Sequence, residues 1–561
     1  MLTFDLSRLW LAALGFVVAY VTQSTARWLH HGYKLRKTVR DMQAKGAPTL
    51  PHSWIFGHLI FMGEFRKDHP EDANIYNMQC WFMDNVARFF PGEETIPPVI
   101  YLDLWPLLNS PMIMTTHPAV SAQYTQLKSL PKSRTSTVYL TPLTANKDIV
   151  SVEGDEWKHW RSRLNPGFSP RNITALLPEL VEEMLVFIDG LKKLAGKDGT
   201  WGEVFQFEER TMNLTFDIII RASLDTRLHQ QTLGTDTPLK SALLAQLEQM
   251  GRMANPARGF LHAFNPFGSF TIAENNKVMR DFFVPNIQKS IQSESRSSGK
   301  RTIVDLALKQ FNVEADSKAQ AKPDEEFINI LLSNLKAFLF AGHDTTATTL
   351  CWMFKSLQDN PNCLEKLRAE HTAVLGPDVD QAHEVILKSP HLLYALPYTL
   401  AVIKETLRLY PLAATVREGR ADFFLTAPGS PFKYPTDGFA LWDGVPAIQS
   451  RADLWVKGNE FFPERWLATE GDTLYPPKDA WRPFSMGPRN CIGLELALVE
   501  LRLVAVMMAR KFDVQEAWHK WDAKKGNTGS KPMVKGERLY RVGTGTVHPK
   551  DGMPVHIRVR Q

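Results

Sequence analysis

Cysteine is scarce in this chain of 561 residues. Its four cysteines, Cys80, Cys351, Cys363 and Cys491, form no CxxC pair, which excludes a disulfide-rich scaffold and suits a reducing compartment or isolated thiols. The sequence also lacks an HExxH motif, so a zinc hydrolase of that class is excluded. A function that uses cysteine must therefore depend on a single residue.

The chain also lacks a large excess of charge of one sign. The 65 Lys and Arg residues oppose 60 Asp and Glu residues, which leaves a net charge of +5. Outside the N-terminal segment there is no basic tract, so we expect no nucleic acid partner. Hydrophobic residues make up 44% of the chain and include 32 Phe and 15 Trp, enough for a large apolar interior that encloses a ligand.

The apolar run at the N-terminus is short. Residues 9–21 (LWLAALGFVVAYV) carry no charge, but a membrane-crossing helix needs about 20 residues and a signal peptide core roughly 7–15. A buried or amphipathic helix is a further alternative. The basic residues that follow favour an uncleaved anchor with a cytosolic body. We therefore expect a transmembrane anchor over 1–25, a basic and proline-containing linker over 26–56, and one large domain over 57–561.

The body is predicted to be mainly α with small β-sheets, an α+β fold. Apolar residues recur at helical spacing in several long segments, and short runs rich in β-branched and aromatic residues predict strands. The expected helices lie at 176–194, 239–250, 327–357, 391–410 and 492–511. The expected strands lie at 99–104, 423–426, 439–441, 539–542 and 555–559.

One cysteine lies in a loop of unusual composition. Residues 483–493 are PFSMGPRNCIG and lead into a helical pattern. The amides and dipole of a helix start favour a thiolate, which is a competent metal ligand. Gly487 and Gly493 permit close backbone approach to a flat partner, and Arg489 can pair with a carboxylate. Because a lone cysteine is more often a small buried apolar residue, the pattern around Cys491 carries the argument.

This loop resembles the Phe-x-x-Gly-x-Arg-x-Cys-x-Gly signature of the cytochrome P450 family. The resemblance implies the P450 fold around haem b, with Cys491 as the axial ligand of the iron, Phe484 beside the sulfur and Arg489 as a propionate partner. Gly487 and Gly493 belong to the same signature. Zinc is the competing metal, but the clustered Cys and His ligands that it needs are absent.

A second motif interrupts an apolar helix. Residues 341–346 are AGHDTT, and helix stability alone would not select a glycine, an acid and two hydroxyls here. A threonine can return its hydroxyl to a carbonyl one turn back and open a groove. The segment resembles the oxygen-activating motif of the family, which implies that Asp344 and Thr345 deliver protons. A polar kink in a core helix is the alternative.

Glu405 and Arg408 lie three residues apart in a helical segment, so they share one face and can form a bidentate pair. Alone, such a pair is an ordinary surface ion pair. The Glu-x-x-Arg of the family occupies the same place in the motif order, and FPERW supplies Arg465. The resemblance implies that these three residues form a structural triad that steadies the haem loop.

Three more residues are candidates for haem binding. Trp157 and Arg161 form a Trp-x-x-x-Arg sequence, which is either a surface cation–π contact or, by the resemblance, a pair that binds a haem propionate. Arg417 falls where the family often has a further propionate partner. The motifs run from Trp157 to Cys491 in the order of the family.

The resemblance implies a monooxygenase that inserts one oxygen atom from O2 into an apolar small molecule. Residues 138–149, 338–341 and 412–416 are mostly apolar and are the expected pocket lining. No second nucleotide domain is visible, so electrons are expected from a separate membrane-bound NADPH-dependent flavoprotein reductase. The expected location is the endoplasmic reticulum membrane.

The substrate and two alternative functions stay open. Residues 164–169 and 548–554 look similar to fungal enzymes of polyketide, terpenoid and meroterpenoid biosynthesis. One alternative is a haem-thiolate isomerase or dehydratase, which commonly lacks the acid and alcohol of Asp344 and Thr345. The other is a non-catalytic haem-binding sensor.

Overall fold

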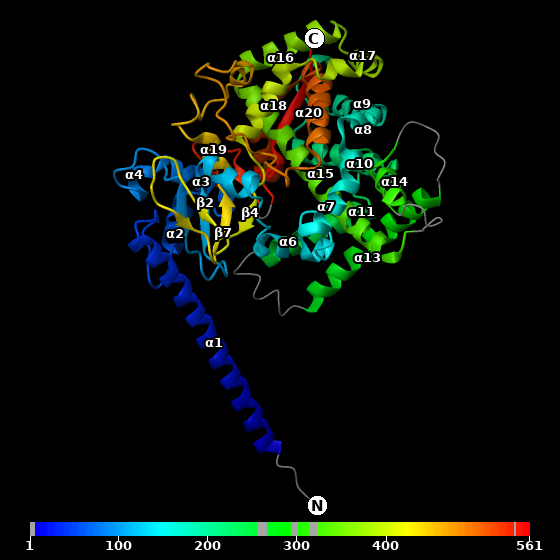
Figure 1. The fold of residues 1–561 in the computed structure, drawn as a ribbon. Helices are drawn as coiled ribbons and strands as arrows, with labels where there is room; N and C mark the ends of the chain where they lie inside the picture. The colour runs from blue at the N-terminus through cyan, green and yellow to red at the C-terminus, as the bar shows by residue number, and fades with distance from the viewer. Residues whose placement is uncertain (1–5, 255–265, 293–300, 315–322, 544–545) are drawn as a thin grey trace, which may run out of the picture.

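Helices make up most of the computed structural model, which describes residues 6–254, 266–292, 301–314, 323–543 and 546–561. The small sheet that contains β2, β7 and β4 lies to one side of the helices, next to α1 to α4 (Figure 1). The mainly helical fold with small sheets is thus confirmed.

The longest helix of the body, α15 (Glu325–Asp359), runs through its centre (Figure 1). Asp324 caps its first turn, because its side chain accepts a hydrogen bond from the Phe327 amide at 2.8 Å. The helix is apolar on most sides and packs against α10 (Phe207–Leu224), α18 (Pro397–Leu409) and α20 (Leu494–Ala509). A helix buried on all sides is a rigid base for a site.

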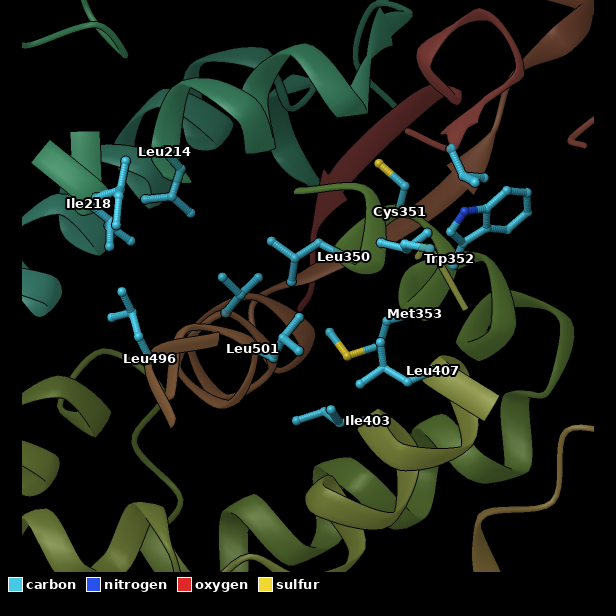
Figure 2. Close-up of a cluster of buried hydrophobic side chains, with 14 of the residues drawn as sticks. Leu214, Ile218, Leu350, Cys351, Trp352, Met353, Ile403, Leu407, Leu496 and Leu501 are labelled. Atoms are coloured by element: carbon cyan, nitrogen blue, oxygen red, sulfur yellow. The ribbon is translucent and has the colours of Figure 1, made fainter. Parts of the chain in front are cut away.

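These four helices share one apolar core. Trp352 of α15 stacks on Tyr410 with ring centroids 4.3 Å apart, and each large side chain buried in this way contributes about 1.5–3 kcal/mol. The core therefore fixes α20, which begins three residues after Cys491, relative to α15. Figure 2 shows Leu214 and Ile218 of α10, Leu350 to Met353 of α15, Ile403 and Leu407 of α18, and Leu496 and Leu501 of α20 converging.

The helices agree with the sequence at four of five places. The exception is 391–410, which is a 3-10 turn at Pro390–Leu393 followed by α18 from Pro397. Leu396 has φ −121°, because a residue before proline is displaced from the helical region. The matching helices are α9 (Leu177–Leu194), α11 (Pro238–Ala254), α15 and α20. The others are α2 (Leu59–Asp68), α3 (Ile75–Asp84), α4 (Val86–Phe89), α5 (Pro118–Ala122), α6 (Arg134–Thr144), α7 (Gly154–Leu164), α8 (Pro170–Ala175), α13 (Pro266–Gln292), α14 (Ile303–Glu314), α16 (Pro361–Leu375), α17 (Ala382–Lys388), α19 (Val445–Ser450) and α21 (Trp518–Lys525).

The largest sheet has the strand order β1-β2-β7-β4. Its strands are β1 (Val99–Leu102), β2 (Met112–Thr115), β7 (Ala440–Asp443) and β4 (Val416–Glu418). β2 and β7 are parallel, while the two outer pairs are antiparallel. The residues of β1, β2 and β7 are buried. The pairing of β7 with the edge strand β4 therefore fixes the position of Arg417, which lies on β4.

All five expected strands are present, but the last two belong to different sheets. They are too short to choose partners from sequence. β9 (Arg541–Val542) pairs with β10 (His548–Pro549), whereas β11 (Pro554–Val559) pairs with β8 (Phe512–Glu516) and β3 (Phe205–Gln206); β5 (Phe424–Leu425) pairs with β6 (Tyr434–Pro435).

The N-terminal helix α1 (Leu6–Ala44) is one continuous element that extends away from the body (Figure 1). The expected division at residue 25 falls inside it. Its outer part exposes apolar side chains, with Trp10 75% and Phe16 80% exposed. Among the described residues, no helix combines the length and the apolar character that crossing a bilayer demands.

The expected linker over 26–56 is helical as far as residue 44 and then lies against the body. The Tyr101 amide donates to the Pro48 carbonyl at 3.0 Å, so this segment runs along β1. Arg36 of α1 forms an ion pair of 3.5 Å with buried Asp103, which also contacts His52 at 2.9 Å. These contacts fasten the base of α1 to the domain.

Candidate active site

Cys491 lies at the end of a closed loop just before α20. Its amide donates to the Phe484 carbonyl at 2.9 Å, and the Asn490 amide donates to the Gly487 carbonyl at 3.1 Å. Gly487 has φ +81°, and a Cβ there would lie 2.2 Å from the Thr125 carbonyl oxygen. The loop therefore requires glycine at 487 because of its positive φ and the close Thr125 backbone.

The Cys491 sulfur faces an internal space. The residue is accessible to solvent, yet enough protein surrounds it that burial raises the pKa of the thiol. The Gly493 amide and the Arg161 charge act in the opposite direction but are outweighed. The amide at the helix start thus favours the thiolate, as expected, but desolvation outweighs it in this chain. A metal cation would supply the missing positive charge.

Arg161 of α7 braces the cysteine loop. Its Nη1 donates to the Asn490 carbonyl at 2.8 Å, its Nη2 to the Asn490 side chain at 3.0 Å, and its Nε to Asn165 at 2.8 Å. All three guanidinium nitrogens are thus engaged by protein. Trp157, on the same helix, makes the cation–π contact, but its partner is Arg489 at 4.4 Å.

Three cationic side chains from separate segments gather beside this loop. Arg417 of β4 is fully buried and donates to the Leu130 carbonyl at 3.0 Å, while its Nε and Nη2 have no hydrogen-bond partner among the described residues. Lys132 donates to Thr415 at 3.1 Å. Burial, together with the charges of Arg417 and Arg489, lowers the pKa of Lys132 to about 7. Buried donors without a partner are costly, so the cluster fits an anionic ligand.

One carboxylate balances part of this charge. Glu153 forms an ion pair with Arg489 and accepts from the Lys132 amide at 2.7 Å. Arg489 also donates to the Val152 and Ile149 carbonyls, at 2.8 and 3.2 Å. Arg489 is therefore largely satisfied within the protein, and Arg417 is the residue with free donors.

Glu405, Arg408 and Arg465 form one buried unit in the structure. Arg408 donates to both carboxylate oxygens of Glu405 at 2.8 and 2.9 Å, and Arg465 donates to the same carboxylate at 3.1 Å. All three side chains are at most 1% exposed, so this is not a surface pair. The Trp466 indole adds a hydrogen bond of 2.9 Å.

The triad connects to the cysteine loop through Gln449. Its side-chain amide donates to the Arg408 carbonyl at 2.8 Å, and its oxygen accepts from the Arg482 amide at 2.7 Å. Arg482 forms a buried ion pair of 2.9 Å with Asp443 and donates to Thr125 at 2.9 Å. The start of the loop is thus held by α18 and β7.

The acid and alcohol motif lies on α15, which stays α-helical throughout. Thr345 returns its hydroxyl to the Ala341 carbonyl at 2.9 Å, as expected, and Thr215 of α10 donates to the His343 carbonyl at 2.6 Å. Ala341 is exposed within a helix that is otherwise mostly buried, so an open space adjoins this turn. Asp344 is only 3% exposed and forms an ion pair with His548.

Two chains of contacts place this helix beside the cysteine loop. Phe168 stacks edge-on against Phe338 with centroids 5.0 Å apart and lies 4.0 Å from the Cβ position of Gly493. Asn334 accepts from the Ile149 amide at 2.9 Å, and the Ile149 carbonyl accepts from Arg489. Cys491 and the Ala341–Thr345 turn are therefore parts of one site.

The family of the chain follows from comparison with known proteins. The cytochrome P450 family model matches residues 102–535. The chain belongs to the cytochrome P450 family. Cytochrome P450 monooxygenase polC of Polytolypa hystricis is 35% identical over 541 residues, which cover 95% of this P450 and 93% of that protein. Cytochrome P450 monooxygenase acrF of Aspergillus aculeatus is 29% identical over 82% of this P450 and 94% of its own length.

A solved structure supports the fold. The haem domain of cytochrome P450DA has a TM-score of 0.67 at 18% identity, with 92% of this P450 and 98% of that chain covered. Membership in the family makes this P450 an oxidoreductase of the monooxygenase type that uses haem, O2 and a redox partner. Among the described residues, no three His, Cys, Asp or Glu side chains gather as zinc would require.

The site contains residues that sequence reasoning missed. Lys132 belongs to the cationic cluster, and His548 touches Asp344. Neither residue belongs to a motif quoted above for this site, and each reaches it only through tertiary contacts. For Lys132 the sequence offered a weak signal of a cationic site, because this lysine lies between Pro131 and Ser133, just ahead of the expected pocket lining.

Proposed function

We propose that this P450 binds haem b and inserts one oxygen atom from O2 into an apolar small molecule. The observation that carries the proposal is that Cys491 and the Ala341–Thr345 turn adjoin one site, with the unpartnered donors of Arg417 beside it. A porphyrin needs an axial ligand and cations for its propionates, and these residues fit both needs.

Each group of side chains has its own task. Bound haem supplies the oxidising chemistry, for which a thiolate ligand favours O–O cleavage. Arg417, Lys132 and Arg489 would hold the propionates, and Cys491 would hold the iron. Asp344 and Thr345 would hold and pass protons at the carboxylate and hydroxyl oxygens, while the surrounding apolar core excludes water.

The substrate we propose is an apolar polyketide, terpenoid or meroterpenoid of fungal secondary metabolism. Val138 is 54% exposed at the start of the expected lining, and Ala341 and Ala413 are exposed small residues in the other two lining segments. Apolar walls of this kind select an apolar ligand. Two relatives of this P450, polC and acrF, are fungal cytochrome P450 monooxygenases, which supports the proposal of a fungal monooxygenase.

We further propose an NADPH-dependent flavoprotein reductase as the electron donor and a single-pass anchor in the endoplasmic reticulum membrane, with a cytosolic catalytic domain. The projecting α1 with its exposed Trp10, Phe16 and Tyr20 supports a membrane contact. Removal of residues 1–25 is expected to move the protein from the membrane pellet to the supernatant. Continued sedimentation with lipid would contradict the anchor.

The deciding experiment is a carbon monoxide difference spectrum of the reduced holoprotein. The wild type is expected to show the Soret shift typical of thiolate ligation, and Cys491→His is expected to lose it while still binding haem. A normal shift in Cys491→His would contradict the ligand assignment. Cys363→Ser is the matched control, because Cys363 is a buried free cysteine of α16 and does not belong to this loop.

The two alternative functions predict different electron use. With purified reductase, a monooxygenase consumes NADPH and O2 together, a peroxide isomerase turns over without NADPH, and a sensor consumes neither. Coupled consumption of NADPH and O2 is the expected result. The buried acid and alcohol at Asp344 and Thr345 favour it over both alternatives.

A further inference from the structure

His548 occupies a position that the motifs of the site do not explain. It lies on β10, near the C-terminus, 340 residues after Glu208 of α10 and 204 residues after Asp344 of α15. Its Nδ1 is 2.8 Å from Glu208 Oε1 on α10, and its Nε2 is 3.5 Å from Asp344 Oδ1 on α15. One imidazole therefore joins two carboxylates, one of which is the acid of the oxygen motif.

The surroundings of the ring are uneven. The Thr546 hydroxyl lies 3.0 Å from Nε2, on the same side as Asp344. The His548 side chain is 28% exposed, whereas Glu208 is 11% and Asp344 4% exposed. Glu208 also accepts from Thr348 of α15 at 3.2 Å. The ring thus has one nitrogen fixed by Glu208 and one shared between a partly accessible hydroxyl and the buried acid.

We propose that His548 is a positioning residue that supplies protons to Asp344, with Glu208 fixing the ring. This proposal rests on the proposed monooxygenase function. In the step, the imidazolium gives its Nε2 proton to Asp344 Oδ1. The neutral ring keeps its proton on Nδ1, which donates a hydrogen bond to Glu208. A proton from solvent, passed through the Thr546 hydroxyl, restores the imidazolium at Nε2. No electron moves, and the net change is one proton carried from solvent to a buried carboxyl group.

The electrostatics support this arrangement. Burial lowers the pKa of His548, but the hydrogen bond to Glu208 and the charges of Asp344 and Glu208 outweigh it and raise the pKa to about 9. Three further titratable groups lie near these carboxylates. Burial and the Asp344 charge raise the pKa of Tyr139 of α6 to about 12, burial lowers the pKa of His343, and burial with the Glu208 charge raises the pKa of the Cys351 thiol. His548 therefore carries a proton across the neutral range and loses it only as the pH rises through about 9.

The first experiment measures the protonation of the ring directly. Histidine-labelled holoprotein is studied by 15N NMR in the reduced carbon monoxide complex, and the His548 signal is assigned by its loss in His548→Gln. We expect an imidazolium at pH 8 in the wild type and a neutral ring at pH 8 in Glu208→Gln. A neutral ring in the wild type at pH 8 would overturn the proposal, whether or not the enzyme is an oxygenase.

The second experiment measures turnover with reductase. His548→Gln is expected to slow O2-dependent NADPH oxidation by about tenfold or more and to enlarge the solvent deuterium isotope effect. His556→Gln on β11 is the matched control, because the contacts of His556 are with Gln515, Lys520 and Trp201 and not with the two carboxylates. The carbon monoxide spectrum must stay normal in both variants, which shows that the cysteine loop is intact.

The outcomes separate the two proposals. If His548→Gln lowers only the Tm and leaves the rate and the isotope effect unchanged, the ion pair is structural and this proposal is wrong. If the wild type consumes no NADPH despite a normal carbon monoxide spectrum, the monooxygenase function fails, while the NMR titration still tests the protonation of His548.

Discussion

The buried arginines near the cysteine loop fall into two groups, Arg408 with Arg465 and Arg417 by itself. The groups differ in how many of their hydrogen-bond donors have a partner within the protein. Arg408 and Arg465 donate hydrogen bonds to Glu405 and to backbone carbonyls such as those of Gly458 and Val456. Arg417 has two buried donors, Nε and Nη2, without a hydrogen-bond partner among the described residues. An arginine whose donors all have partners stabilises the fold, whereas a buried arginine with unpaired donors fits an anionic ligand.

The largest effect is expected in the group of Arg408 with Arg465. Glu405→Gln leaves Arg408 and Arg465 buried with less than their full charge balance, and breaking a buried pair in this way costs about 3–5 kcal/mol. We expect a large loss in the free energy of unfolding and little haem incorporation, measured by thermal unfolding and the haem to protein ratio. Near-normal stability would show that the triad is not what holds the loop.

The next prediction is that substitution by leucine changes the stability of the apoprotein in opposite directions in the two groups. Arg417→Leu removes unsatisfied buried donors, so the apoprotein is expected to gain about 1–3 kcal/mol in stability, while haem dissociates faster to an apomyoglobin acceptor. Arg465→Leu is the matched control and is expected to destabilise both forms, because its three nitrogens are engaged. Equal behaviour of the two variants would remove the distinction.

A pH dependence sharpens the same comparison. The pKa of Lys132 is about 7 in the folded apoprotein because burial and the two arginines lower it, so between pH 7 and about 10 the unfolded chain binds more protons. Stability of the apoprotein therefore rises with pH in this window, by at most about 1.4 kcal/mol per pH unit. Lys132→Met is expected to flatten this slope in urea titrations at several pH values. An unchanged slope would contradict the assignment.

The smallest effect concerns Trp157. Its indole lies 4.4 Å from the Arg489 guanidinium, and such a contact contributes about 0.5–1 kcal/mol when exposed. Trp157→Phe keeps an aromatic face, so we expect a loss below about 1 kcal/mol and an unchanged haem dissociation rate. A marked increase in haem loss would instead favour the direct propionate bond that the sequence left open.

Sequence reasoning succeeded where a motif and a local pattern coincide. The cysteine loop, the acid and alcohol turn and the Glu405–Arg408 pair each depend on neighbouring residues in one segment, so their sequence patterns could indicate them. It failed where partners come from distant segments. The thiolate was expected from the helix start, but the surrounding protein raises the pKa of Cys491, and burial of that kind is not visible in a loop sequence.

The strands show the same limit. Each was found from composition, yet the assignment of β9 and β11 to separate sheets depends on β10 and β8. At the N-terminus, the prolines predicted an extended segment, but its packing along β1 through the Pro48 carbonyl depends on the tertiary fold. Short segments carry too little information to choose their partners.

By itself, the sequence determined the family, the order of the motifs and the mainly helical architecture, because these follow from local residue patterns and helical periodicity. Only the tertiary structure decided which cations are satisfied and which are free, that Lys132 joins Arg417, and that His548 reaches Asp344. These are properties of distance and burial between segments far apart in the chain, and hydrogen-bond satisfaction exists only once those segments have packed together.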